Sequence, residues 1–155
     1  TSVTYPFPVI RMADLYLMYA EALNEKGEDY ATVLPWIDMV RERSGLQGVK
    51  ESWDQYVGNS KYATQTGLRR IIMQERRIEL AFEGHYFWDV RRWKTATTEL
   101  TQPLTGWKVR YGETDVDYYS ENLVLVRDFT PKMYFWPIDI GELRKDPNLV
   151  QNYGW

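Results

Sequence analysis

The sequence predicts a mostly α-helical fold with a small antiparallel β-hairpin and an irregular C-terminal tail. Apolar residues recur with helical spacing through residues 10–94. After residue 98 apolar and polar residues alternate, as they do in a half-buried strand. The chain has 155 residues, which is long enough for one domain with a hydrophobic core. We therefore expect both patterns to belong to a single domain.

Residues 10–26 predict a helix with apolar side chains on almost every side. A helix of this kind is buried on all sides in a folded protein. The remaining segments of the chain can cover only part of it. We therefore expect some of its residues to face a preceding repeat or another chain, among them Leu15, Met18, Tyr19 and Ala22.

A second helix is predicted over residues 29–44. Asp29 suits its N-terminal cap, and Gly45 suits a left-handed exit. Its apolar stripe has helical spacing and consists of Tyr30, Val33, Leu34, Ile37 and Val40. Because a short linker with Gly27 joins the two helices, we expect an antiparallel hairpin, typical of one tetratricopeptide-like unit.

The third helical pattern follows a polar segment. Residues 46–66 predict a loop with a short helical turn. Residues 66–83 have the strongest apolar stripe of the chain and predict its clearest helix. Gly84 is expected to break or bend that helix, and residues 86–94 are expected to continue as a short one.

The β-hairpin is predicted from two segments. Residues 107–111 alternate between apolar and basic side chains, and residues 123–128 are rich in β-forming residues. We expect them to pair in antiparallel fashion, joined by a loop that contains Tyr118 and Tyr119. Residues 133–136 are expected to form a third short extended segment. The tail after them should hold one helical turn and an irregular end.

Composition excludes several classes of protein. The net charge is -3 and the charges are mixed along the chain, so nucleic acid is a poor partner. The chain has no cysteine, which excludes disulfides, thiolate nucleophiles and cysteine-based metal sites within it. No run of 18 apolar residues is present that would span a membrane as a helix.

Three glutamates repeat every four residues along one face of the predicted helix 66–83. Glu75, Glu79 and Glu83 could be a hydrolase or metal site, or they could pair with arginines. Hydrolysis needs two carboxylates that flank a sugar in a cleft, and a dimetal bundle needs Glu-x-x-His spacing. The single histidine, His85, stands too close to Glu83 for that spacing.

We therefore predict that the chain is not an enzyme and holds no metal and no cofactor. The charged residues are expected to form a structural ion-pair network of Glu75, Arg76, Arg77, Glu79, Glu83, Arg91 and Arg92. Glu75 lies on the apolar stripe, where an unpaired charge would be costly. It should be largely buried and within salt-bridge range of an arginine.

The aromatic residues divide into two groups, in a chain with 7 Trp and 12 Tyr. One group lies among helical apolar residues and is expected in the core: Tyr16, Tyr19, Trp36, Phe82 and Phe87. The other lies in polar segments and supplies candidate ligand-binding residues: Trp53, Tyr56, Trp107, Tyr118 and Tyr119. Exposed rings of this kind can stack on the C–H faces of sugars, or they can be local packing anchors.

Three stretches, in matching order, resemble the SusD/RagB family: residues 9–22 with 40–46, residues 75–93, and residues 135–138 with 146–155. The second stretch is the most specific, since it runs from Glu75-Arg76-Arg77 to Arg91-Arg92-Trp93. Family members are much longer. The resemblance therefore implies that residues 1–155 are the C-terminal portion of such a protein, with the N-terminal repeats missing.

The resemblance also implies a function. Such proteins are outward-facing lipoproteins of the outer membrane, anchored through an N-terminal lipid that would not be in this chain. They bind oligosaccharides or other nutrients without catalysis and pass them to a SusC-like TonB-dependent transporter. The expected partners are thus the transporter, the nutrient and the N-terminal part of the same protein. The alternative is a helical-repeat protein-interaction module without a small-molecule ligand.

Overall fold

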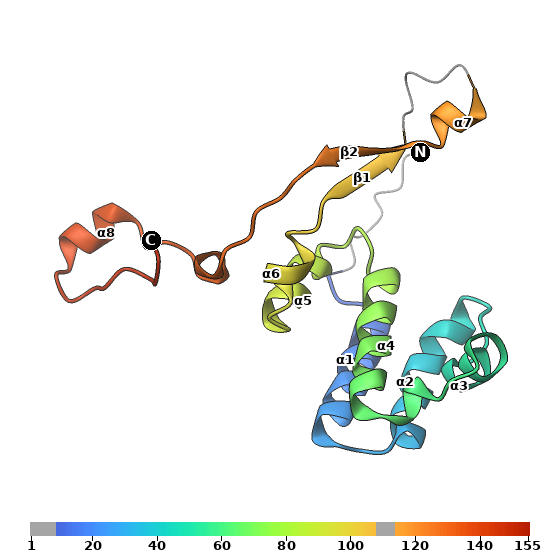
Figure 1. The fold of residues 1–155 in the computed structure, drawn as a ribbon. Helices are drawn as coiled ribbons and strands as arrows, with labels where there is room; N and C mark the ends of the chain where they lie inside the picture. The colour runs from blue at the N-terminus through green and yellow to red at the C-terminus, as the bar shows by residue number, and fades with distance from the viewer. Residues whose placement is uncertain (1–8, 108–113) are drawn as a thin grey trace, which may run out of the picture. The chain divides into compact units, whose positions relative to one another are not determined.

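The computed structural model describes residues 9–107 and 114–155, in two compact units (Figure 1). The first, which we call the helical unit, comprises Thr1–Tyr86, and the second, the mixed unit, comprises Phe87–Trp155. The described residues are mostly helical with one two-stranded antiparallel sheet. The predicted fold class is thereby confirmed. In the described part of the chain, no helix is long and apolar enough to cross a membrane.

Three helices form the framework of the helical unit: α1 (Met12–Lys26), α2 (Tyr30–Arg43) and α4 (Gln65–Glu79). Their inward stripes build the core, in which Leu17, Ile37 and Ile72 are fully buried. Removing such side chains from water is the main favourable contribution to folding. The predicted helical hairpin of α1 and α2 is confirmed.

Local signals set the ends of this hairpin. Gly27 follows α1 with a φ of 89°, in the left-handed region that glycine tolerates best. The Asp29 side chain accepts a hydrogen bond of 2.8 Å from the backbone N–H of Thr32 and caps α2. Both positions were predicted from residue type alone, because caps depend on neighbouring residues in the chain.

The segment between α2 and α4 is more helical than predicted. It contains α3 (Val49–Ser52), a π-helical turn (Trp53–Val57) and a 3₁₀ turn (Lys61–Ala63). Thr64 caps α4 by accepting a hydrogen bond from the N–H of Gly67 at 3.1 Å. At Gly67 a Cβ would lie 2.0 Å from the Lys61 carbonyl oxygen, so only glycine allows this turn to pack against α4.

In the mixed unit, short elements follow one another. α5 (His85–Arg92), which begins just before the boundary, is followed by α6 (Ala96–Glu99), β1 (Leu104–Trp107), α7 (Asp115–Tyr118) and β2 (Glu121–Leu125). A 3₁₀ turn (Pro131–Tyr134) and α8 (Ile140–Lys145) complete the chain. β1 and β2 are antiparallel, with Trp107 opposite Glu121. The predicted hairpin and helical turn in the tail are confirmed.

Two predictions about this unit need correction. The first strand is described from Leu104 to Trp107, and the predicted residues 108–111 lie outside the described residues. The extended segment predicted over 133–136 is wrong, because a 3₁₀ turn occupies its first half and no strand follows. Pro131 begins that turn, and its fixed φ suits the first position of a helical turn. Tyr118 closes a short helix rather than lying in a loop.

The expected core aromatics are only partly buried. The rings of Tyr16 and Trp36 pack against the core, with centroids 5.8 Å apart. Phe82 is fully exposed, so its assignment to the core is wrong. α4 ends at Glu79, earlier than predicted, and Leu80 is the residue that is buried there. Tyr19, at 48%, and Phe87, at 39%, are also more exposed than core residues, so these two assignments are wrong as well.

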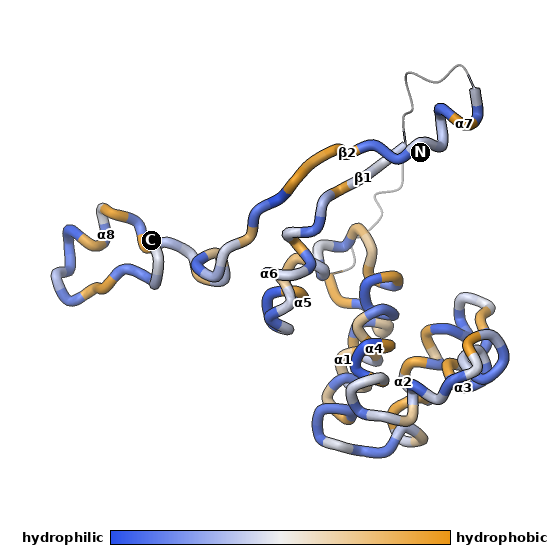
Figure 2. The backbone as a smooth tube through the Cα atoms, viewed as in Figure 1, coloured by the Kyte–Doolittle hydropathy of each residue, from blue (hydrophilic) through white to orange (hydrophobic). Residues whose placement is uncertain are grey.

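One face of α1 is uncovered by the described residues. Leu15, Met18 and Tyr19 are 41%, 42% and 48% exposed, and Ala22 is exposed as well. These are the residues expected to face something outside the chain. β2 also carries an exposed apolar run, which is orange in Figure 2. What covers these surfaces stays a prediction.

Candidate functional site

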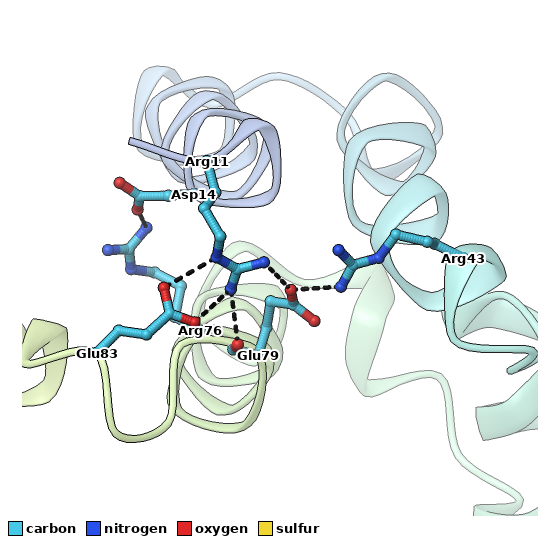
Figure 3. Close-up of polar contacts among 6 residues, drawn as sticks. All are labelled: Arg11, Asp14, Arg43, Arg76, Glu79 and Glu83. Atoms are coloured by element: carbon cyan, nitrogen blue, oxygen red, sulfur yellow. Dashed lines mark hydrogen bonds and ion pairs between the residues drawn. The ribbon is translucent and has the colours of Figure 1, made fainter. Parts of the chain in front are cut away.

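The carboxylates at the end of α4 are held by arginines from the other two long helices (Figure 3). Arg11, just before α1, donates to Glu79 at 2.8 Å and to Glu83 at 2.7 and 2.9 Å. Arg43, at the end of α2, donates to Glu79 at 2.5 Å. Hydrogen bonds with Glu83 and then Glu79 raise the pKa of Arg11 above its ordinary value. The cluster joins the start of α1 to the end of α4.

A second ion pair lies deeper between the same helices. Arg76 donates to Asp14 at 2.8 Å, and these two residues are 3% and 8% exposed. Glu75 pairs with Arg41 of α2, and the side chain of Glu75 is 13% exposed. The prediction that Glu75 is largely buried and paired is therefore confirmed. Its partner comes from α2, a contact between helices that spacing within α4 could not predict.

The remaining arginines of the predicted network make other contacts. Arg77 lies over the ring of Tyr86 at 4.9 Å, and Arg91 lies over the ring of Phe87 at 3.6 Å. Arg92 donates to Asp89 at 2.8 Å. The three glutamates thus face guanidinium groups, whereas a general acid or nucleophile has to face its substrate. Among the described residues, no group of His, Cys, Asp and Glu is placed to hold a metal ion.

Three of the five candidate ligand-binding aromatics come together at the hairpin. We call Trp107, Tyr118 and Tyr119 the hairpin trio; the Tyr119 ring lies 5.8 Å from Trp107 and 5.0 Å from Tyr118. Their exposed fractions are 56%, 39% and 63%. Trp107 also lines a hollow of about 180 Å³ with Thr105 and Glu121. The trio is an exposed aromatic surface with polar groups beside it.

The other two candidates belong to the helical unit. Trp53 packs against the core, and the ammonium of Lys61 lies over its ring at 5.2 Å. Tyr56 is 74% exposed. Trp53 therefore has a packing role in the described structure, as the alternative interpretation of loop aromatics allowed.

One cavity among the described residues was not predicted from sequence. It has a volume of about 700 Å³ and lies in the mixed unit. We call it the aromatic pocket; its lining residues are Trp88, Arg91, Arg92, Lys94, Pro131, Tyr134, Phe135, Trp136 and Tyr153. The sequence held a signal for one wall, because Trp88 and Arg92 are four residues apart and therefore share one face of α5.

The described fold is a helical hairpin of the tetratricopeptide type with further helices, followed by a β-hairpin and an aromatic-rich tail. The sequence matches the SusD family over residues 2–155. The chain therefore belongs to the SusD family.

Relatives and solved structures agree with this assignment. A SusD-like protein of Formosa agariphila is 39% identical over 93% of this chain and 23% of its own length. The crystal structure of a SusD-like protein from Bacteroides fragilis has a TM-score of 0.75 and 30% identity, covering 99% of this chain and 28% of that one. A SusD-like carbohydrate binding protein from the same species has a TM-score of 0.71 and 32% identity, covering 92% and 28%.

The chain is thus short relative to its family. It spans about a quarter of the length of these three proteins.

Proposed function

We propose that this chain is the C-terminal part of a cell-surface protein that binds an oligosaccharide, or another nutrient, without chemically changing it. The protein would face outward from the outer membrane, held by an N-terminal lipid anchor. It would pass its ligand to a SusC-like TonB-dependent transporter. Membership of the SusD family and the carbohydrate-binding relative support this proposal.

The observation that carries the proposal is the hairpin trio. A flat indole such as that of Trp107 can cover the C–H face of a sugar ring, while hydroxyl and carboxylate groups bind the sugar hydroxyls. Thr105 and Glu121 supply such groups beside Trp107, and the Thr105 hydroxyl donates to Glu121 at 2.6 Å. Exposed aromatic rings at this density are typical of binding surfaces.

The alternative is a protein-interaction module with no small ligand. The observation that favours it is the uncovered face of α1, with Leu15, Met18 and Tyr19 exposed. In this alternative, the uncovered face of α1 binds a helix of a partner protein, and the hairpin trio binds no ligand.

A glycan array separates these two functions. It should be probed with the natural-length polypeptide that carries this chain and, in parallel, with residues 1–155 alone. We expect the natural-length protein to bind a restricted set of oligosaccharides. If the natural-length protein binds no oligosaccharide on the array but does bind a helical partner, the interaction module is favoured.

Replacing Trp107 with alanine is expected to weaken glycan binding by about tenfold or more, as loss of a central aromatic contact does in other interfaces. The fold should be little affected, because the side chain is 56% exposed. Titration of the array-selected glycan measures the effect. Phe82→Ala, which removes an exposed ring from the helical unit that is not among the candidate binding residues, is the comparison. If the wild type and Trp107→Ala bind the glycan with equal affinity, the hairpin trio is not part of the binding site.

A further inference from the structure

The aromatic pocket combines flat apolar walls with positive charge. Trp88, Trp136 and Tyr153 are 60%, 66% and 79% exposed, so their rings are accessible. The volume of about 700 Å³ lies within the range of sites that hold small ligands. One or more sugar rings would fit against these walls.

The charge of the lining is the feature that the proposed function does not explain. Arg91, Arg92 and Lys94 line the pocket, and no Asp or Glu is among the described residues that line it. Arg92 is already paired with Asp89 at 2.8 Å, so Arg91 and Lys94 carry the argument.

The Arg91 side chain is held in place by two aromatic rings. The Arg91 guanidinium lies 3.6 Å from the ring centroid of Phe87 and 5.1 Å from that of Phe129. One Nη of Arg91 donates to the Phe87 carbonyl oxygen at 3.3 Å, whereas its Nε is buried without a hydrogen-bond partner in the described structure. A ring against the face of a guanidinium leaves the remaining N–H groups at its edge to bind an acceptor in its plane. Lys94 is exposed and lines the pocket. Its φ of 58° is a left-handed conformation that is uncommon for residues other than glycine.

We propose that the aromatic pocket binds a saccharide that carries a negative charge, either the carboxylate of a uronic acid or a sulfate ester. The sugar ring would stack on Trp88 or Trp136, and its oxyanion would face Arg91 and Lys94. This inference rests on the proposed glycan-binding function and names the class of glycan.

Two matched pairs of probes test it in the natural-length polypeptide. One pair is trigalacturonic acid and its full methyl ester; the other is a sulfated galactose trisaccharide and its desulfated form. At low salt and neutral pH, we expect the charged member of at least one pair to bind about tenfold more tightly than its neutral form. The pair that shows the preference distinguishes carboxylate from sulfate.

Variants assign that preference to the pocket. Lys94→Gln removes the charge and keeps a polar side chain that is one atom shorter, and should reduce the preference about threefold or more. Lys145→Gln, which removes an exposed charge from α8 outside the pocket, should leave it unchanged. Trp136→Ala should weaken both members of the preferred pair, because it removes a wall of the pocket.

The inference is overturned if both pairs bind equally, or if the preference survives Lys94→Gln. If a neutral glycan binds, and its affinity falls on Trp107→Ala but not on Lys94→Gln, the proposed function stands and only this inference fails. If no glycan binds, charged or neutral, both fail together.

Discussion

Replacing Arg76 with methionine is expected to destabilise the helical unit by about 3–5 kcal/mol. The change leaves Asp14 inside the protein without the guanidinium that it faces at 2.8 Å. Asp14 is 8% exposed, so water does little to screen its charge. Chemical denaturation of the natural-length polypeptide, followed by helical circular dichroism, measures the loss.

Two further variants make this prediction specific. Arg70→Met removes an exposed arginine from the same helix and should cost less than about 1 kcal/mol. The double variant Asp14→Leu with Arg76→Met replaces the whole pair by apolar side chains and should recover much of the stability, because no charge is left buried. If Arg76→Met is no more harmful than Arg70→Met, the buried pair does not stabilise the helical packing.

Residues 1–155 expressed alone are expected to aggregate or to unfold without cooperativity. Leu15, Met18 and Tyr19 leave one face of α1 uncovered in the described structure, and β2 exposes Val124 at 67%. Apolar faces and strand edges of this kind associate when nothing covers them. Size-exclusion chromatography with light scattering, followed by thermal unfolding, provides the measurement.

Introducing charge on the uncovered face of α1 tests whether that face causes the aggregation. Leu15→Lys with Met18→Lys should make the isolated chain more soluble, since it places charge on the uncovered face. In the natural-length polypeptide the same pair should be destabilising, because there it would bury two charges against a preceding repeat. A wild-type fragment that is a soluble monomer with one cooperative unfolding transition would show instead that the chain is a complete small domain.

The parts of the fold that were predictable from sequence are those with local causes. Helical spacing identified α1, α2 and α4, and the caps at Gly27 and Asp29 follow from the preferences of single residues. The errors fall where distant contacts decide. Phe82 continues the helical spacing of α4, but the helix ends at Glu79 and Leu80 is buried instead.

The same division applies to the candidate site. The phase of α4 predicted that Glu75 would be buried, whereas its partner Arg41 comes from a different helix. The residues of the hairpin trio were candidates because they lie in polar segments or near a predicted strand edge, and their binding role stays a prediction. The aromatic pocket was missed because its walls, such as Trp88 and Trp136, are far apart in the chain and meet only in the folded unit.

The central claim is that the protein binds an oligosaccharide and leaves it intact. Isothermal titration of the natural-length polypeptide with an array-selected oligosaccharide, followed by mass spectrometry of the recovered sugar, tests both parts at once. We predict saturable binding, weakened by Trp107→Ala, with the sugar recovered at its original mass. Cleavage of the sugar that is abolished by Glu75→Gln or Glu79→Gln, or the absence of saturable binding to any oligosaccharide, would contradict the account.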